Sequence, residues 1–168
     1  MEAAPCCQSS RAWTCKWALE VRAEWVGKLK SGEKRIEVRA YPLPQLLIGV
    51  PIAIVVPADM GCGHIQQSPC SGLPDVVPAG LSGAHVAGCV VFERVKLYKS
   101  EDEFVQDQPH CVPIGSPYGW QQGVSETLYG WVLSSTGSYW CDPALPVPEM
   151  KRHLRSIYSL QSDFPLSC

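Results

Sequence analysis

The stretch "SGEKRIEVRAYP", residues 31–42, alternates charged and aliphatic side chains and then stops at a tyrosine–proline pair. Side chains of a β-strand point alternately to opposite faces, so this pattern predicts a strand over residues 34–39. Its two aliphatic side chains would face the core. Glu37 and Arg39 would project together from the other face, about 6.5 Å apart. A ladder of ion pairs on the surface and one wall of a binding cleft would both produce this pattern.

At 168 residues the chain has the length of one domain with a core of its own. Its composition, 46% hydrophobic and 18% charged residues, is typical of a globular protein and not of a disordered one. No apolar run reaches the roughly 20 residues of a membrane helix, and the first residues lack the pattern of a secretory signal. We therefore expect an intracellular protein, cytoplasmic or nuclear, with no membrane partner. A short organelle transit peptide is the alternative.

The formal net charge of −2 argues against a protein that is coated with positive charge for non-specific binding of nucleic acid. The charge is unevenly distributed, however. Residues 22–39 hold six basic and three acidic side chains, whereas residues 99–126 hold one lysine and five acidic side chains. This distribution is compatible with local contact between one basic face and a polyanion.

The nine cysteines are expected to be reduced thiols, because disulfides seldom persist inside cells. Ligand types for zinc are present at Cys62, His64, Cys70, His85 and Cys89, but no CxxC pair occurs. The last two lie on a predicted strand about 13 Å apart, too far for one tetrahedral site. We predict no metal site. No phosphate-cradling glycine loop is present either, and we expect no cofactor.

Strands dominate the pattern along the rest of the chain, with two short helices. The helices are expected over residues 22–32 and 100–104, and the strands over residues 16–21, 34–39, 46–57, 84–98, 128–135 and 155–160. Gly88 is a predicted bulge, and Trp25 and Trp131 are expected in the core. The fold class is mixed α+β, mainly β. Because the strands do not alternate regularly with helices, the pattern favours a small mixed barrel.

A single domain is expected over residues 16–162. Residues 1–15 are mostly small or polar and show no hydrophobic periodicity, so we expect them to form a loosely ordered tail. Residues 163–168 are expected to form a second short tail. Residues 58–83 are rich in glycine, proline, serine and cysteine, and we interpret them as an insertion between two strands.

The charged strand and the loop after the second helix supply the candidate ligand-binding residues. Arg39 could hold a phosphate or carboxylate with its planar fork. Glu37 could accept a hydrogen bond from the amine of a base, and Lys34 could swing over the same space as a point charge. Trp120, in a glycine-flanked loop, is a candidate for stacking on a base. His110, between two loop prolines, is a candidate cleft residue. Surface pairing or packing is the alternative for each.

The segment "GEKRIEVR", directly after a helix that ends in glycine, resembles the start of an ASCH domain (activating signal cointegrator homology). That family carries the motif G-x-K-x-x-E-x-R, which maps here onto Gly32, Lys34, Glu37 and Arg39. Later segments are similar in order, so that the resemblance covers about residues 16–162. It implies a PUA-like β-barrel with two or three short helices. It also implies a cleft, lined by the lysine, glutamate and arginine of the motif, that binds RNA or a modified nucleotide.

Small bacterial members of this family are amidohydrolases that remove the acetyl group from acetylated cytidine with a lysine, a threonine and a glutamate. The threonine falls where Glu37 stands here, and a carboxylate cannot serve as that hydroxyl nucleophile. One alternative to binding is therefore a hydrolase, of amidohydrolase or ribonuclease type, with Lys34 and Glu37 as an acid–base pair. Its substrate would be RNA or an acylated cytidine nucleoside. A coactivator-type protein-interaction domain is another alternative. Binding is favoured because no nucleophile is apparent.

Overall fold

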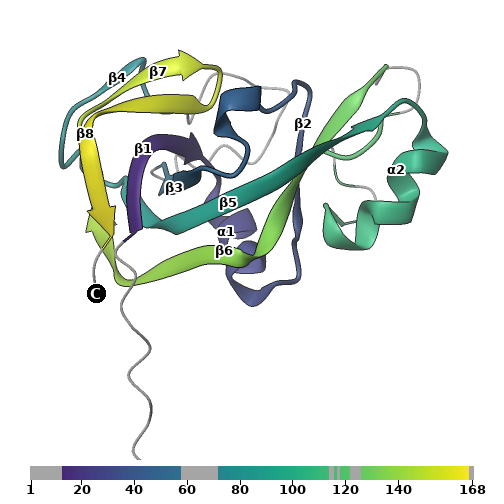
Figure 1. Cartoon of the computed structure of the whole chain (residues 1–168), viewed down its shortest axis with the longest axis horizontal. Coiled ribbons are helices and arrows are strands. Elements are labelled where there is room, and N and C mark those ends of the chain that lie inside the picture. Colours follow the sequence, from purple (N-terminus) through teal and green to yellow (C-terminus); the bar gives the residue numbers. More distant parts are fainter. Residues whose placement is uncertain (1–12, 58–71, 114–115, 117, 122–125, 167–168) are drawn as a thin grey trace, which may run out of the picture.

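The computed structural model describes residues 13–57, 72–113, 116, 118–121 and 126–166. These residues form eight strands, two α-helices and two short 3-10 helices (Figure 1). The strands are β1 (Trp13–Glu20), β2 (Ile36–Arg39), β3 (Pro51–Val56), β4 (Val76–Val77), β5 (His85–Tyr98), β6 (Leu128–Pro146), β7 (Met150–Leu154) and β8 (Ile157–Leu166). The helices are α1 (Ala23–Ser31), η1 (Gln45–Leu47), α2 (Glu101–Asp107) and η2 (Gln108–His110). None of the helices in these residues is long and apolar enough to span a lipid bilayer.

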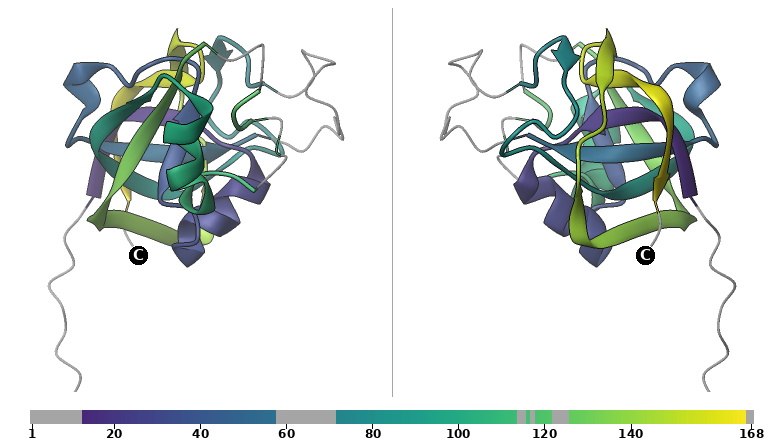
Figure 2. Two further views of the ribbon diagram at one scale, coloured as in Figure 1. Left: turned by 90° about the vertical axis from the view of Figure 1, so that its right-hand side faces the viewer. Right: turned by 90° about the vertical axis from the view of Figure 1, so that its left-hand side faces the viewer.

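All eight strands belong to one mixed sheet in the order β2-β6-β5-β3-β1-β8-β7-β4. The pair β1–β3 is parallel, and the other pairs are antiparallel. The sheet curls strongly around its core (Figure 2). The mainly-β fold class with two helices is therefore confirmed. Within the described residues β2 and β4 remain the two edges of the sheet, so that its closure into a barrel stays a prediction.

Two strands were not expected from the sequence, and several expected boundaries differ. β3 begins at Pro51 and not at residue 46, and β6 continues to Pro146, past the expected end at residue 135. β4 is only two residues long, and β7 buries one side chain in five, so neither carries an apolar pattern. The expected tail of residues 1–15 includes the start of β1, because Trp13 pairs with Leu166 at the end of β8. β8 thus continues past position 162. The remaining residues of that tail, 1–12, lie outside the described residues, as do residues 58–71 of the expected insertion.

Gly88 is a bulge, as its position within a strand predicted. The register between β3 and β5 shifts beside it, where Ile54 pairs with Gly88 and Val55 pairs with Val86. The φ angle of Gly88 is 157°, and a Cβ at this position would collide with the carbonyl of Tyr139. Only glycine fits such a close approach between β5 and β6.

The core consists of three clusters of buried side chains. The first lies among β1, β3, β5 and the strands β4, β7 and β8, the second joins α1 to β1 and β3, and the third joins α2 to β2, β5 and β6. Trp131 is fully buried in the second cluster, which confirms its predicted place in the core. Trp25 is only partly buried and packs against both the second and the third cluster. The candidate site lies where these two clusters meet.

Candidate functional site

The turn between α1 and β2 sets the position of Lys34. Gly32 ends the helix in the left-handed conformation, with φ 77°, and its N–H donates to the carbonyl of Leu29 at 3.2 Å. The N–H of Lys34 then donates to the carbonyl of Lys28 at 2.9 Å. Glycine adopts this conformation without strain, which is why the helix can end here and turn directly into the strand. The turn directs the side chain of Lys34 inward, where only 3% of the residue is exposed.

The ammonium group of Lys34 is held by three oxygen atoms. It donates to the carbonyls of Ile36 at 2.8 Å and Cys111 at 2.7 Å, and it lies 3.4 Å from Oε2 of Glu37. It also lies over the ring of Trp25, 5.4 Å from the centroid. The two carbonyls engage two of the three N–H donors of the ammonium group, and Oε2 of Glu37 lies beside it as an ion-pair partner without a hydrogen bond. The expectation of a mobile point charge is therefore wrong: Lys34 is a fixed, buried cation.

Glu37 is flanked by two cations and is only 5% exposed. Its Oε1 forms an ion pair with Nη2 of Arg39 at 2.8 Å, and its Oε2 faces Lys34 at the longer distance of 3.4 Å. A carboxylate removed from water between two cations differs from the surface ladder that was the alternative interpretation of this strand. Oε2 has no closer partner in the described part of the chain.

Arg39 ties β2 to elements that do not pair with it. Nη2 donates to the carbonyl of Glu20 at 3.1 Å, and Nη1 donates to Oγ of Ser156 at 3.1 Å. The guanidinium lies 5.9 Å from the ring centroid of Trp131. With the ion pair to Glu37, the two terminal nitrogens thus serve protein oxygens, which does not fit the expected bidentate grip on a phosphate. Nε has no partner among the described residues.

Tyr41 and Ser156 were not identified from the sequence. The hydroxyl of Tyr41 lies 2.5 Å from Oγ of Ser156, the same atom that accepts from Arg39. The indole N–H of Trp131 donates to the carbonyl of Tyr41 at 3.2 Å. Tyr41 lies two residues after Arg39 in the sequence. Its closeness to the charged motif could have identified it as a candidate site residue. Ser156 comes from the turn between β7 and β8, and nothing in the sequence around it indicates a place in the site.

Tyr118 is the aromatic side chain closest to this arrangement on the loop side. Its ring meets Trp25 edge-on, with centroids 5.8 Å apart, and the guanidinium of Arg22 lies 5.5 Å from its centroid. Burial raises the pKa of Tyr118, while the positive charges of Arg22 and Arg39 act in the opposite direction. Its hydroxyl is buried and has no partner in the part of the chain that the structure describes.

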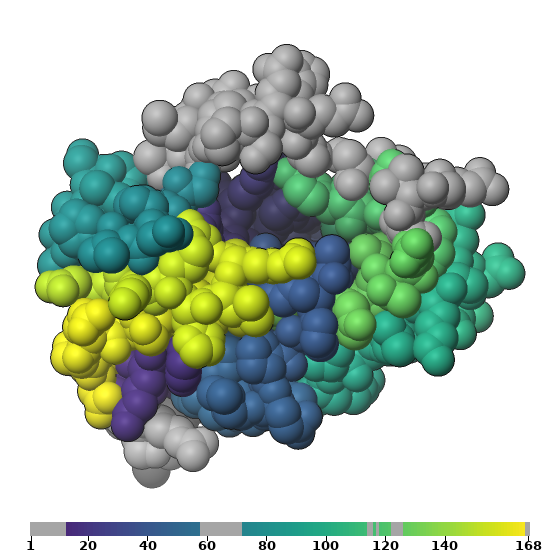
Figure 3. Space-filling model, turned by 90° about the horizontal axis from the view of Figure 1, so that it is seen from above, coloured from purple at the N-terminus to yellow at the C-terminus, as the bar shows by residue number. Residues whose placement is uncertain are grey.

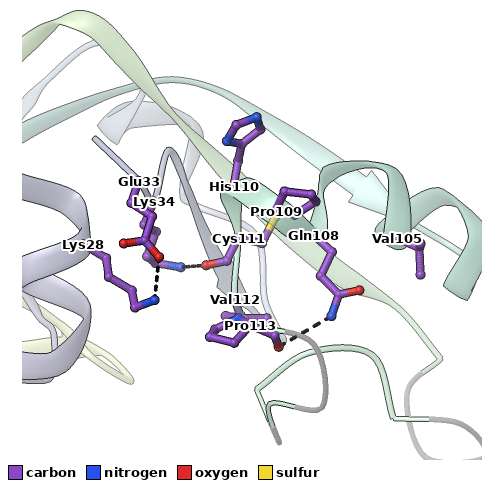
Figure 4. A pocket seen from close by; sticks show the side chains of 10 residues that line it. All are labelled: Lys28, Glu33, Lys34, Val105, Gln108, Pro109, His110, Cys111, Val112 and Pro113. Carbon is purple, nitrogen blue, oxygen red and sulfur yellow. Dashed lines mark hydrogen bonds and ion pairs between the residues drawn. The ribbon is translucent and has the colours of Figure 1, made fainter. Parts of the chain in front are cut away.

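The other two candidates are Trp120 and His110. Trp120 is half-buried and packs against the third cluster, but it is Tyr118 that meets Trp25 edge-on. His110 is exposed and lines a groove of about 500 Å³ between α1 and the η2 segment (Figure 4). Lys34 forms part of the wall of this groove, which is otherwise largely apolar.

Together Lys34, Glu37 and Arg39 form a buried charged group that we name the Glu37 centre. Three buried polar atoms at or beside it have no partner among the described residues: Oε2 of Glu37, Nε of Arg39 and the hydroxyl of Tyr118. Buried polar atoms are normally hydrogen-bonded, and a cluster of exceptions indicates missing partners. Figure 3 shows a hollow in one face of the molecule, between the hairpin of β7 and β8, the segment after β2 and the residues after α2. The centre can accept one hydrogen bond and donate another.

The structure leaves the metal prediction largely untested. Cys62, His64 and Cys70 lie outside the described residues, and the described residues hold no group of three or more potential metal ligands. Cys89 is fully buried in the first cluster. Its interaction with Cys15, together with burial, raises the pKa of the Cys89 thiol. A neutral, enclosed thiol is a packing group and not a reactive one.

Comparison with known proteins supports the fold that the motif predicted. No protein-family model matches the sequence, and no curated protein matches it. Among solved structures, an ASCH protein from Zymomonas mobilis is similar with a TM-score of 0.50 and 14% identity, over 86% of this chain and 87% of that chain. A tyrosine-to-phenylalanine variant of the Zymomonas protein gives a TM-score of 0.51 and 13% identity, over 86% and 89% of the two chains. The protein thus has the ASCH-domain fold.

Proposed function

We propose that this ASCH-fold protein binds RNA or a nucleotide in the hollow beside the Glu37 centre. The observation that carries the proposal is the set of buried atoms without partners on Glu37, Arg39 and Tyr118. Leaving a polar atom buried and unpaired costs about 1–3 kcal/mol, more for a charged group. A ligand with an N–H donor beside an acceptor would complete both Oε2 of Glu37 and Nε of Arg39. The edge of a nucleobase presents such neighbouring donors and acceptors.

Aromatic side chains on two sides of the centre support the same ligand class. Trp25 and Tyr118 form one edge-to-face pair, and Tyr41 and Trp131 form another with centroids 5.5 Å apart. Aromatic side chains bind unstacked bases through their faces, without strong preference for one base. Of these four, Trp131 is fully buried and supports Tyr41 from below, while the other three are partly exposed.

The charge of the centre favours an anionic ligand. Lys34 and Arg39 contribute two positive charges against the single negative charge of Glu37, within a chain of net charge −2. A local positive potential in a hollow attracts an anion more strongly than the net charge would suggest. The motif resemblance agrees, because the lysine, glutamate and arginine of the family motif are taken to line its ligand cleft.

The proposal is tested by Glu37→Gln, which keeps the shape of the side chain and removes its charge. The variant and the parent are titrated calorimetrically with the four ribonucleosides and their monophosphates. The variant should bind the best ligand about tenfold more weakly than the parent does. Glu33→Gln is the matched control, because Glu33 lies in the same turn and forms only an exposed pair with Lys28 at 2.6 Å. Equal binding by the parent and Glu37→Gln, with an unchanged circular dichroism spectrum, would contradict the proposal.

One distance favours the hydrolase alternative. The carboxylate of Glu37 lies within 3.4 Å of the Lys34 ammonium in a buried site, which is the pair that an acid–base mechanism requires. The two carbonyls that hold Lys34 oppose it, because they stabilise the protonated amine and leave it no free lone pair. We therefore rank hydrolysis second. Release of acetate from acetylated cytidine, abolished by both Lys34→Met and Glu37→Gln, would reverse the ranking.

A further inference from the structure

Two arginines stack on the two tyrosines that flank the Glu37 centre. Arg22, just before α1, lies over Tyr118 at 5.5 Å, and Arg155, in the turn between β7 and β8, lies over Tyr41 at 4.8 Å. Both distances, from guanidinium carbon to ring centroid, are within the range of cation–π contacts. The two arginines come from opposite ends of the described chain.

Both tyrosines connect to the Glu37 centre. Tyr41 shares the hydroxyl of Ser156 with Arg39. Tyr118 meets Trp25 edge-on, with centroids 5.8 Å apart, and the ammonium group of Lys34 lies 5.4 Å from the centroid of the same tryptophan. The contacts therefore run in one line, from an arginine through a tyrosine and a tryptophan to the centre, and on through a second tyrosine to a second arginine.

The outer arginines differ from Arg39 in what their N–H groups do. Both terminal nitrogens of Arg39 donate to protein oxygens. Within the described residues, Arg22 and Arg155 make no hydrogen bond or ion pair through their guanidinium groups, only the stacking contact. A guanidinium whose N–H groups serve no protein acceptor can offer them to a phosphate, whose oxygens match the fork geometry of the group. The stack also restricts the side chain before any ligand arrives.

The backbone at Arg155 supports a specific role for this side chain. Its φ of 49° makes it the one non-glycine residue of the described chain with a positive φ. Glycine or asparagine is more usual at such a position, and left-handed arginine is uncommon. Residues held in such conformations tend to cluster where a ligand is bound. Here the conformation sets the direction of the arginine that covers Tyr41.

From this line of contacts we infer that the ligand is a single strand of RNA that crosses the hollow. One base lies at the Glu37 centre, and the phosphates on its two sides are held by Arg22 and Arg155. This inference rests on the proposed function and narrows it, because a nucleoside has no phosphate and a mononucleotide has only one. Basic and aromatic side chains in alternation are the usual platform for a single strand, where the bases stack and the cations follow the backbone.

The test compares RNA pentamers of each of the four bases, labelled with fluorescein, with the four free ribonucleosides. Anisotropy is measured for the parent, Arg22→Gln and Arg155→Asn at several salt concentrations. Asparagine is chosen because it tolerates the left-handed conformation at position 155. Each variant should weaken binding of the best pentamer by about tenfold and reduce the slope of log K against log salt by about 0.7, as one lost phosphate contact predicts for a single strand. Nucleoside affinity, measured by calorimetry, should not change.

Matched controls separate this effect from general charge. Lys30→Gln removes an exposed cation from α1, and Lys151→Gln removes one from β7, both without a stacking contact. Neither should change pentamer affinity by more than about twofold. Equal losses in the controls and in the two arginine variants would overturn the inference, because long-range charge would then explain the result.

Two further outcomes distinguish the inference from the proposed function. In one outcome the arginine variants bind the pentamer like the parent, while Glu37→Gln still binds nucleosides more weakly. This result would leave the proposed function standing and would overturn the inference of a bound RNA strand. The same holds if the parent binds nucleosides but none of the pentamers. Unchanged nucleoside and pentamer binding by Glu37→Gln would overturn the proposed function itself.

Discussion

The molecule contains two acid–arginine groups that differ in how completely they are paired. The first is the Glu37 centre. The second, which we name the Glu20 cluster, consists of Glu20, Asp75, Arg152 and Tyr158. In it Oε1 of Glu20 accepts from the N–H of Leu73 at 3.0 Å, and Oε2 accepts from the hydroxyl of Tyr158 at 3.1 Å. Arg152 forms an ion pair with Asp75 at 2.7 Å and covers the ring of Tyr158 at 4.7 Å.

The contrast in pairing distinguishes the structural role of the Glu20 cluster from the binding role that we propose for the Glu37 centre. In the Glu20 cluster each carboxylate oxygen of Glu20 has a close donor, and the cluster fastens the segment at Leu73 to the end of β1. In the Glu37 centre one carboxylate oxygen and one guanidinium nitrogen have no close partner among the described residues. The two groups adjoin, since Arg39 donates to the carbonyl of Glu20. The two groups therefore differ in pairing, and the proposed binding role applies to the one that is incompletely paired.

The largest effect is expected from Lys34→Met. The substitution removes the ammonium that bonds to the carbonyls of Ile36 and Cys111 and leaves Glu37 with one cation instead of two. Breaking a buried ion pair from one side costs about 3–5 kcal/mol, because the remaining charge stays buried. Urea unfolding measures this loss. Lys28→Met, which breaks only an exposed pair, should cost about 0–1 kcal/mol. Similar losses in both variants would mean that the Glu37 centre does not contribute to stability.

An intermediate effect is expected from Glu20→Ala, in stability and not in binding. The change leaves the N–H of Leu73 and the hydroxyl of Tyr158 without their carboxylate partner, at a cost of about 1–3 kcal/mol. Affinity for nucleosides should stay the same. A loss of affinity without a loss of stability would show that the two groups have been assigned to the wrong roles.

The loss in Glu20→Ala should also depend on pH. Burial raises the pKa of Glu20 above its usual value of 4.5, so the folded state holds this proton more tightly than the unfolded chain does. The stability that this carboxyl contributes is then fully present below its unfolded pKa and decreases as pH rises through the folded pKa. Parent and variant should therefore differ more in free energy of unfolding at about pH 4 than at about pH 7.

The smallest loss of stability is expected from Tyr118→Phe. Its hydroxyl is buried without a described hydrogen-bond partner, so its removal should not lower the free energy of unfolding and should raise it by up to about 1–3 kcal/mol, the cost of leaving such a group unpaired. Tyr98→Phe is the matched control. The hydroxyl of Tyr98 donates to Asp107 at 2.6 Å, and its loss should cost about 1.5–3 kcal/mol. Equal costs would indicate that the Tyr118 hydroxyl is paired within the fold, and the comparison between saturated and unsaturated groups would then fail.

The local sequence pattern was sufficient to predict the elements that show a regular alternation of side chains or a helix-capping residue. The alternation over residues 34–39 predicted β2, and Gly32 predicted the end of α1. Ser100 caps α2 by accepting from the N–H of Glu103 at 3.3 Å, at the spacing that the sequence shows. β4 and β7 were missed because a strand with a single buried side chain shows no apolar alternation in the sequence.

The same limit applies to the site. The alternation of side chains along a strand was enough to place Glu37 and Arg39 on one face, because this alternation depends only on neighbours in sequence. Their burial and the engagement of the arginine could not be predicted, since these depend on Ser156 and Tyr118. Both come from distant parts of the chain and are positioned by the topology of the sheet. Trp120 was preferred over Tyr118 on loop composition, which carries no information about which aromatic side chain faces the centre.

The bond between Arg39 and Ser156 joins residues 117 positions apart and so has a consequence for biosynthesis. A ribosome releases the lysine, glutamate and arginine of the motif long before it releases the last hairpin. Because contacts this distant in sequence form only after the intervening chain has been ordered, the charged centre is assembled late. A product truncated before β7 would carry the complete motif and lack the hydroxyl that anchors its arginine. The proposed binding site would be complete only when synthesis has passed the final hairpin.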